Sequence, residues 1–276
     1  MKLLNLVARV CKTFTTSGSQ HMRTIQKVKD EQRRDVVTEL DMKLHQISEQ
    51  FVAERLPGCK LLSEEDAYVK AHKGEWTKGE WLVVDPLDGS NNYALSLPNY
   101  GFMATHLHDG RIQGSVVVLP EHNQYIVLQD KQILYAQPIP LNSANDNGTV
   151  YYAYPPKQDK QAREARSALL DLIDDKSAGM YRYGSACAAL YQLLCGKHMA
   201  FIGHGIRIWD AIAFLPLLTS KQIKVMYAIY GNDLTMLAST RVDFLYSAAQ
   251  IIEAEQGINF HIFSDGDLSV SEPCIL

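Results

Sequence analysis

The segment Trp81–Asn92, with the sequence WLVVDPLDGSNN, is the most informative part of this chain of 276 residues. Its first four residues have the length and β-branched content of a buried strand. Pro86 cannot donate a ladder hydrogen bond, so we expect the strand to end at Asp85. The segment therefore predicts two carboxylates, Asp85 and Asp88, where the chain leaves a sheet, an arrangement that suits a hard metal ion.

The residues that follow these carboxylates suit a bound anion. Gly89 can take a positive φ or let a ligand approach the main chain, and Ser90 and Asn91 suit a turn or a helix N-terminus whose N–H groups favour an anion. Two carboxylates and a backbone carbonyl form an all-oxygen ligand set, which suits magnesium, manganese or calcium and disfavours zinc or copper. The alternative is an acidic surface turn of the D-x-x-D-G kind.

Upstream, residues 35–41 lead into an amphipathic stretch. Its apolar positions have the spacing of a helix packed on a core: Leu40, Leu44, Ile47, Phe51, Val52 and Leu56. Asp41 would lie in the first turn of this helix. Thr38 and Asp41 fit a capping box, so helix capping is the simplest role for Asp41 considered by itself.

Two further acids follow apolar residues. Glu64 comes after the pair Leu61-Leu62, where the alternative is a solvated acidic loop. Asp210 follows Trp209 immediately before an apolar run, where an acid could simply cap a helix.

Taken together, the four segments resemble the inositol monophosphatase family of magnesium-dependent, lithium-sensitive phosphomonoesterases. The family's motifs D-x-V-T-x-x-D, G-E-E, W-x-x-D-P-[IL]-D-G-[TS]-x-N and W-D correspond to residues 35–41, 63–65, 81–92 and 209–210. The third motif is highly specific, and its agreement with three weaker ones makes chance a poor explanation. The resemblance covers roughly residues 30–215.

By position, the resemblance implies a cofactor of two to three magnesium ions, with manganese as a substitute. A first ion would be bound by Glu64, Asp85 and the Leu87 carbonyl. A second ion, the basis of lithium sensitivity, would be bound by Asp85, Asp88 and Asp210, and a third, weaker ion would rest on Glu64. Clustered divalent ions neutralise a phosphate monoester and acidify a water, which then attacks phosphorus in line.

The resemblance also implies the other site residues. Asp41 and Ser90 would form the pair that orients and deprotonates the attacking water. The remaining residues would bind the phosphate or line the substrate pocket: Gly89, Ser90, Asn91, Gly184, Ser185 and Ala186. We also expect Arg207 and His204 to add positive character near the mouth of the pocket.

The substrate is less well determined than the reaction. Inositol-specific members usually carry a glutamate seven residues before the W-D aspartate, and this chain has Gly203 there. Inositol monophosphate is the first candidate, and a 3'(2'),5'-bisphosphate or a sugar bisphosphate is the alternative. An aspartyl-phosphate enzyme would space its acids as Asp-x-Asp, and a catalytically lapsed member that binds a phosphorylated ligand or a partner is the third possibility.

The fold implied by the resemblance is α/β (mixed α+β), a layered α-β-α-β-α sandwich of the inositol monophosphatase and fructose-1,6-bisphosphatase type. A large mixed sheet is expected in the N-terminal half, residues 1–140, with most metal ligands. A smaller sheet is expected in the C-terminal half, residues 149–276, with Asp210 and the substrate pocket. Strands are predicted at residues 60–62, 81–84, 101–107, 112–119, 124–128, 150–154 and 199–202.

Other local signals complete this prediction. Asp109-Gly110 is a hairpin signal. Helices are predicted at the N-terminus, at residues 159–173 and at residues 185–194, where Gly196 ends the helix. Pro216 should kink or end the helix that follows Asp210. His106-x-His108 places both rings on one face of a strand, and structure explains that pair better than function does.

Composition fits a small-molecule enzyme of the cytoplasm. A net charge of −4 argues against a nucleic-acid polymer as partner. Five cysteines without C-x-x-C spacing favour a reducing compartment, and no apolar run is long enough to span a membrane. The expected partner is a small phosphorylated metabolite. Dimers are common in families of this type, so a homodimer is also considered.

Overall fold

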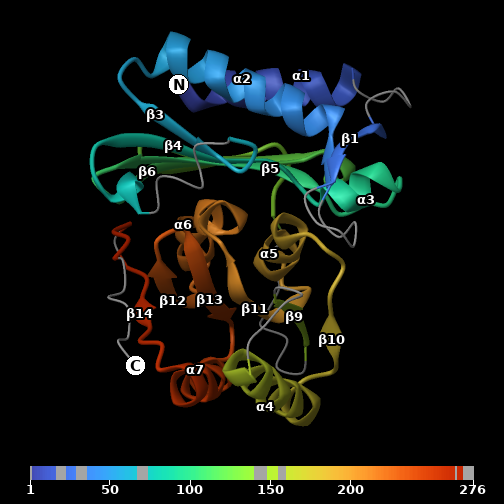
Figure 1. The fold of residues 1–276 in the computed structure, drawn as a ribbon, viewed down its shortest axis with the longest axis vertical. Coiled ribbons are helices and arrows are strands. Elements are labelled where there is room, and N and C mark those ends of the chain that lie inside the picture. Colours follow the sequence, from blue (N-terminus) through green and yellow to red (C-terminus); the bar gives the residue numbers. More distant parts are fainter. Residues whose placement is uncertain are drawn as a thin grey trace.

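The structure is a computed structural model that describes residues 2–16, 23–28, 36–66, 74–139, 148–154, 160–264 and 266–269. Helices and sheets alternate in layers (Figure 1). The helices α1 and α2 cover the outer face of the first sheet, α5 and α6 lie between the two sheets, and α4 and α7 cover the outer face of the second. This is the α-β-α-β-α arrangement that the resemblance implies, and the predicted fold class is confirmed.

The first sheet has the strand order β3-β4-β5-β6-β7-β8, with β3 and β4 parallel and the other pairs antiparallel. Its strands are β3 (Lys60–Ser63), β4 (Glu80–Asp88), β5 (Gly101–His108), β6 (Arg111–Leu119), β7 (Gln124–Gln129) and β8 (Gln132–Tyr135). The helices that cover it are α1 (Lys2–Thr16) and α2 (Glu39–Arg55), and the short α3 (Ser90–Ala94) follows β4. A separate two-stranded sheet pairs β1 (Ile25–Val28) with β2 (Val36–Thr38).

The second sheet has the order β10-β9-β11-β13-β12-β14, in which β9 runs parallel to both of its neighbours. Its strands are β9 (Thr149–Ala153), β10 (Met180–Tyr181), β11 (His198–Arg207), β12 (Lys224–Tyr230), β13 (Asp233–Ser239) and β14 (His261–Ile262). The associated helices are α4 (Lys160–Lys176), α5 (Ala186–Leu194), α6 (Leu215–Ser220) and α7 (Val242–Gln256). Within the described ranges both sheets have six strands, so the second is smaller only in having two-residue strands at both edges.

Strand β4 is apolar throughout its first half because both of its faces are buried. Trp81 and Val83 pack in the layer between the sheets, whereas Leu82 and Val84 pack against α1 and α2. A strand covered on both faces reads as a continuous apolar run rather than an alternating one. This burial places the end of β4, with its acids, inside the molecule.

The predicted end of this strand at Asp85 is wrong. Asp85 pairs with Met103 and Asp88 pairs with Gly101, so three steps along β4 oppose two steps along β5. This is a β-bulge, and it takes Pro86 out of the regular ladder, where its missing N–H would matter. The bulge also re-aims the carboxylates on either side of it.

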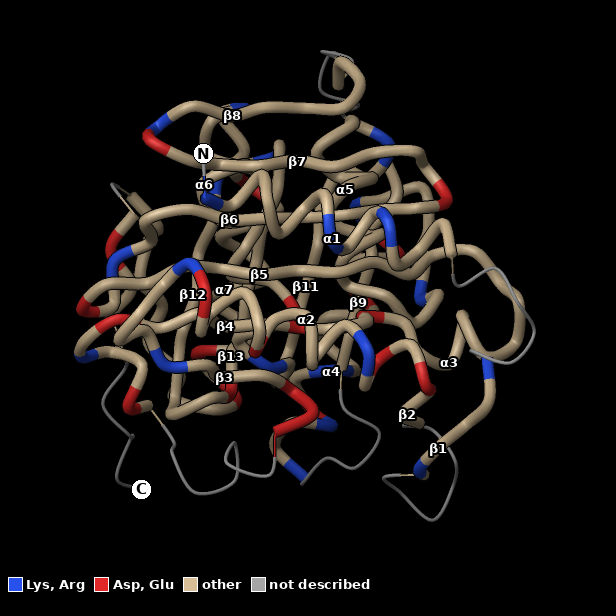
Figure 2. Tube along the Cα trace, turned by 90° about the horizontal axis from the view of Figure 1, so that it is seen from above, with Lys and Arg blue, Asp and Glu red and all other residues tan. Residues whose placement is uncertain are grey.

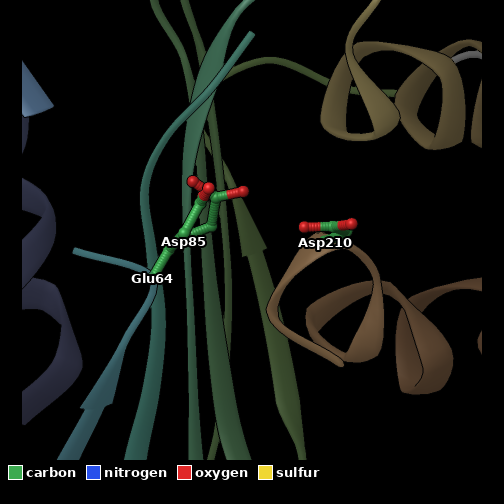
Figure 3. A group of neighbouring side chains, drawn as sticks. All are labelled: Glu64, Asp85 and Asp210. Carbon is green, nitrogen blue, oxygen red and sulfur yellow. The ribbon is translucent and has the colours of Figure 1, made fainter. Parts of the chain in front are cut away.

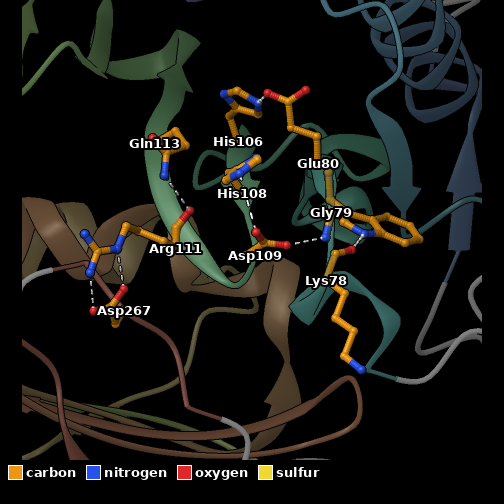
Figure 4. Close-up of polar contacts among 10 residues, drawn as sticks. Lys78, Gly79, Glu80, His106, His108, Asp109, Arg111, Gln113 and Asp267 are labelled. Carbon is orange, nitrogen blue, oxygen red and sulfur yellow. Dashed lines mark hydrogen bonds and ion pairs between the residues drawn. The ribbon is translucent and has the colours of Figure 1, made fainter.

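The predicted capping box and hairpin are confirmed. Thr38 and Asp41 cap α2 reciprocally. Asp109 and Gly110 have φ values of 49° and 74°, as a two-residue hairpin turn requires. Asp109 Oδ1 also accepts a hydrogen bond of 2.7 Å from the Gly79 N–H (Figure 4).

The region after Asp210 differs from the expected single helix. Asp210 ends a turn of 3-10 helix, η5 (Ile208–Asp210), and a second such turn, η6 (Ile212–Phe214), precedes α6. Pro216 lies in the first turn of α6, where its missing N–H has no intrahelical partner to lose, so it begins a helix rather than ending one.

Figure 2 shows Lys and Arg interspersed with Asp and Glu around the described part of the chain. None of the helices in the described ranges combines the length and the hydropathy needed to cross a membrane. The proposed boundary between the halves falls largely on residues 140–147, outside the described residues, as does Asp35 of the first motif.

Candidate metal and phosphate site

Three carboxylates from distant parts of the chain converge between the sheets. Glu64, Asp85 and Asp210 each place one carboxylate oxygen within 4.8 Å of the others. Glu64 directly follows β3 and its N–H donates to the Val84 carbonyl at 3.1 Å, which holds it beside Asp85 on the neighbouring strand. In Figure 3, Asp210 faces this pair from the opposite side.

Asp210 reaches the first sheet because its neighbours are anchored in the core. Ile208 and Trp209 are buried in the layer between the sheets, and η5 packs against β4 and β5. The Arg207 N–H donates to Asp210 Oδ2 at 2.9 Å and fixes the carboxylate at the start of this turn. The same hydrogen bond makes Asp210 a cap of this 3-10 turn, which is the alternative role considered for it.

The electrostatics of this group favour a cation. Asp85 is 1% exposed, and within the described part of the chain no group hydrogen-bonds its buried Oδ1. Burial raises the pKa of both Asp85 and Asp210 well above the usual range, and the nearby carboxylate of Glu64 raises each pKa further. A buried carboxylate oxygen without a partner is costly, and a divalent ion would remove that cost. An all-oxygen donor set suits magnesium.

Asp88 is oriented differently from these three acids. Its Oδ1 accepts from the Ala186 N–H at 3.1 Å, and its Oδ2 accepts from the Cys187 N–H at 2.8 Å and from the Ser185 hydroxyl. These donors form the N-terminus of α5, so Asp88 ties the first sheet to the second half of the molecule. Burial raises the pKa of Asp88 to about 6, although these hydrogen bonds oppose the shift.

Asp41 and Ser90 form a hydroxyl–carboxylate pair. Ser90 Oγ lies 2.6 Å from Asp41 Oδ1 and 2.7 Å from the Leu87 carbonyl oxygen, and its single hydrogen can be donated to only one of them at a time. The Thr38 N–H and hydroxyl donate to Asp41 Oδ2 at 2.8 and 2.5 Å. Asp41 is 1% exposed, and burial raises its pKa against the opposing effect of these hydrogen bonds.

Gly89 is required at its position between the acids and α3. Its φ is +85°, and a Cβ there would lie 2.6 Å from the Asn99 carbonyl oxygen. Glycine is the residue that adopts this conformation without a side-chain clash. The chain can therefore turn sharply after Asp88 and bring Ser90 and Asn91 to the same cavity as the metal-site acids.

Two adjoining cavities surround these residues. The first, of about 170 Å³, is lined by the three acids together with Leu87, Gly89, Ser90 and Asn91. The second, of about 270 Å³, extends away from it, and both are lined by Asp88, Gly184 and Asp210. The second cavity is lined further by Tyr151, Ala153, Tyr154, Arg182, Ser185, Ala186, Gly205, Ile206 and Arg207.

The structure corrects the expected position of His204 and adds Arg182 to the residues around the site. Arg207 lines the second cavity, but His204 is only 3% exposed and lies on the opposite face of β11. His204 Nε2 lies 2.6 Å from Gln256 Oε1 and its Nδ1 lies 3.3 Å from the Tyr152 hydroxyl. Sequence reasoning missed Arg182, although it stands only two residues before Gly184 of the G-[ST]-A element.

Gly203, at the position of the usual inositol-recognising glutamate, has no open space beside it. A Cβ there would lie 2.6 Å from Ile206 Cδ1 and 2.8 Å from Phe201 Cε1. Apolar side chains therefore occupy the position from which a side chain at residue 203 would project.

The histidine pair His106 and His108 does not converge on a shared ligand position (Figure 4). His106 Nε2 lies 3.3 Å from Glu80 Oε1, whereas His108 Nε2 lies 3.5 Å from Asp109 Oδ2. Among the described residues, the metal-ligand geometry is met by Glu64, Asp85 and Asp210.

Comparisons with known proteins identify the family. The model of the inositol monophosphatase family matches residues 4–251. Nus factor SuhB of Xylella fastidiosa is 24% identical over 219 residues, which cover 75% of this chain and 76% of that protein. Putative Nus factor SuhB of Neisseria meningitidis serogroup B is 27% identical over 207 residues, covering 72% and 76%.

Solved structures agree on the fold. A staphylococcal IMPase-I complexed with products superposes with a TM-score of 0.72 at 16% identity, covering 93% of this chain and 96% of that one. Thermotoga maritima IMPase superposes with a TM-score of 0.69 at 16% identity, covering 91% and 96%. The resemblance inferred from the four motifs is thus confirmed.

Proposed function

The chain belongs to the inositol monophosphatase family, and we propose that it is a magnesium-dependent phosphomonoesterase that hydrolyses a small phosphorylated metabolite. The observation that carries the proposal is the convergence of Glu64, Asp85 and Asp210 beside the Ser90–Asp41 pair. Together they provide a divalent-cation site and a hydroxyl–carboxylate relay around one cavity, the two parts that a metal-assisted hydrolysis needs.

The first cavity would hold the ions and the phosphate. Glu64, Asp85 and Asp210 would bind magnesium, with Asp88 and the Leu87 carbonyl as further ligands, in the two to three positions implied by the family. Bound magnesium would supply positive charge to the phosphate oxygens and lower the pKa of a water, and manganese would serve similarly. The N–H groups of Gly89, Ser90 and Asn91 would donate to the phosphate oxygens.

The Ser90–Asp41 pair would remove the proton from the attacking water. When the Ser90 hydroxyl donates to Asp41 Oδ1, the lone pairs of Oγ remain to accept a hydrogen bond from that water. The two hydrogen bonds from Thr38 fix the Asp41 carboxylate in place. Burial that raises the pKa of Asp41 makes its carboxylate a stronger base, which favours proton acceptance.

Two substrate classes are candidates for this site. Inositol monophosphate is the compound suggested by the family. A bisphosphate of a nucleoside or a sugar is favoured instead by two observations, the apolar filling beside Gly203 and the presence of Arg182 and Arg207 in the cavity.

The test is phosphate release from inositol 1-phosphate, fructose 1,6-bisphosphate and 3'-phosphoadenosine 5'-phosphate, with magnesium or with EDTA. We expect magnesium-dependent turnover that is lost in EDTA and in Asp210→Asn, and retained in Asp243→Asn. Asp243 is the matched control because it is an exposed aspartate paired with Arg241. Turnover that persists in EDTA would contradict the metal mechanism.

Two further measurements, phosphoenzyme trapping and magnesium binding, distinguish the competing interpretations. An aspartyl-phosphate enzyme would form a trappable phosphoenzyme, and we expect none. A lapsed member would bind magnesium without turning over any compound, which would favour a role like that named for the relatives, a Nus factor.

A further inference from the structure

The second cavity, which we call the arginine cleft, shares the lining residues Asp88, Gly184 and Asp210 with the cavity of the metal site. Among the described residues that line it, Asp88 and Asp210 are the acidic groups and both lie on its metal-site side. The other charged groups are Arg182 and Arg207. When cations neutralise these acids, the charge that faces a substrate in the arginine cleft is positive.

Arg182 is held in place by Tyr154. Its guanidinium carbon lies 3.8 Å from the centroid of the Tyr154 ring, and its Nη2 donates to the Tyr154 carbonyl at 2.7 Å. Stacking on an aromatic ring and a main-chain hydrogen bond both restrict the rotamers of an arginine before any ligand binds. Arg182 is therefore a pre-organised donor group, which lowers the entropy cost of binding.

Arg207 is fixed at its backbone and adjustable at its head group. Its N–H donates to Asp210, one of the metal-site acids, so its main chain borders the metal site. Its guanidinium pairs with Asp233, and both side chains are about half exposed. An exposed ion pair of this kind contributes little stability, so a bound anion can compete for the guanidinium.

These side chains match an anion better than a ring of hydroxyl groups. A guanidinium has five N–H donors and no acceptor, and its planar fork fits the oxygens of phosphate or carboxylate. Hydroxyl groups of a polyol also need acceptors. The position where the family places a glutamate for that purpose is Gly203, whose surroundings are filled by Ile206 and Phe201.

We propose that the arginine cleft binds a second phosphoryl group of the substrate through Arg182 and Arg207, while the first phosphoryl group is hydrolysed at the metal site. This inference rests on the proposed function and makes the preferred substrate a small bisphosphate. Arg182 and Arg207 are then specificity-determining residues. A monophosphate of the same sugar or nucleoside has no second phosphate for the two guanidinium groups to bind.

The test compares two matched pairs of compounds that differ only in the second phosphate. One pair is adenosine 3',5'-bisphosphate and adenosine 3'-phosphate, and the other is fructose 1,6-bisphosphate and fructose 1-phosphate. Each is assayed with the wild-type protein, Arg182→Gln and Arg207→Gln. Arg166→Gln is the control, because Arg166 also lies over the Tyr154 ring, at 5.1 Å, but does not line the cleft.

We expect wild-type kcat/KM to favour at least one bisphosphate over its monophosphate by about tenfold or more, the size of one charge-assisted hydrogen-bonded contact. Arg182→Gln and Arg207→Gln should each lower that ratio about tenfold, through a higher KM for the bisphosphate. Arg166→Gln should keep the ratio. Equal use of both members of each pair by the wild-type protein, or a ratio unchanged in both cleft variants, would overturn the proposal.

Failure of the proposed function can be told apart from failure of this inference. If the wild-type protein hydrolyses inositol 1-phosphate but none of the four compounds, this inference fails and the phosphatase proposal stands. If it hydrolyses neither inositol 1-phosphate nor any of the four, the phosphatase proposal fails and no turnover disturbs a binding measurement. Titration calorimetry with magnesium present then compares the same compounds on the same variants. Tighter binding of a bisphosphate that is lost in Arg182→Gln supports the arginine cleft, and equal binding of bisphosphate and monophosphate refutes it.

Discussion

The first and second halves of the molecule contribute to the site on different kinds of structure. Glu64, Asp85 and Ser90 lie within one stretch of 27 residues, at or beside the ends of the paired strands β3 and β4. Arg182 lies in the loop between β10 and α5, and Arg207 lies at the end of β11. Asp210 is the point where the second half reaches the first.

Because of this difference, most residues proposed for the reaction lie in the first half, and the residues proposed to select the substrate lie in the second. Residues that bind ions and activate water must hold positions fixed to fractions of an ångström, and paired strand ends provide that rigidity. Residues that select a substrate vary more freely on loops. We therefore expect substitutions of the metal-site acids, Asp210 included, to remove turnover, and substitutions of the two arginines of the cleft to change preference.

The largest effect is expected for Asp85→Asn, about a 1000-fold loss of phosphate release, because it removes a charged ligand whose ion stabilises the transition state. The same substitution should raise the thermal midpoint in EDTA, since burial and neighbouring acids disfavour the Asp85 carboxylate. Kinetics and thermal unfolding measure the two effects. Turnover within a few-fold of the wild-type protein would remove Asp85 from the metal site.

A smaller loss, about 100-fold in kcat, is expected for Ser90→Ala, because the relay to Asp41 is broken while the metal ligands remain. Magnesium should still stabilise this variant against heat. Thr38→Ala is the control for helix capping. It should lower the free energy of unfolding by about 1 kcal/mol through loss of the α2 cap but keep far more turnover than Ser90→Ala. If Ser90→Ala kept the kcat of the wild-type protein, the Ser90–Asp41 pair would have no part in activating the water.

The third effect is on stability and depends on pH. The folded protein holds the pKa of Asp88 at about 6, above the value of about 3.9 for an unfolded chain. Between these values the folded state binds a proton that the unfolded state releases, so the Asp88 contribution increases stability as pH falls through about 6.

This effect is measured in EDTA as a difference from Asp88→Asn, which does not titrate. Between about pH 8 and about pH 5, the wild-type protein should gain roughly 1 kcal/mol relative to the variant. Burial lowers the pKa of His198 to about 4 and opposes the trend below about pH 6.5, but it does so in both proteins. A constant difference between the two unfolding curves would show that Asp88 is ionised throughout.

The smallest expected effect tests whether Asp233 competes with the substrate for Arg207 in the second half. Asp233→Asn removes the carboxylate that competes for Arg207, so bisphosphate KM should fall about 1.5- to 5-fold, the size of an exposed ion pair. Asp267→Asn is the matched control, because Asp267 forms an exposed pair with Arg111 away from the cleft (Figure 4). A rise in bisphosphate KM in Asp233→Asn would mean that the Arg207–Asp233 pair positions the guanidinium instead of competing for it.

Local chemistry made several elements predictable from the sequence. The continuous apolar run before Asp85 predicted a buried strand, Thr38 and Asp41 predicted a helix cap, and Asp109-Gly110 predicted a hairpin. Each signal depends on residues within a few positions of one another, so the sequence contains it completely. The convergence of the acids was inferred only through the resemblance to a family, because their spacing alone also fits surface loops and caps.

Elements that depend on distant partners were missed or misplaced. Strands β1, β2 and β8 are three or four residues long and owe their assignment to pairing rather than to pattern. Pro86 was read as a stop because the bulge that accommodates it exists only through pairing with β5. His204 was assigned to the mouth because nothing local distinguishes the two faces of β11.

The sequence by itself determined the resemblance to the family, since Asp85, Asp88, Gly89 and Ser90 occur in one compact motif whose side-chain donors are all oxygens. Only the tertiary structure decided which residues line the cavity on the other side of the acids. Arg182 and Arg207 are 25 residues apart and meet at one cleft because β10 and β11 both pair with β9. The physical reason is that a motif encodes local geometry, whereas a cleft between two halves forms only after both sheets pack on their shared core.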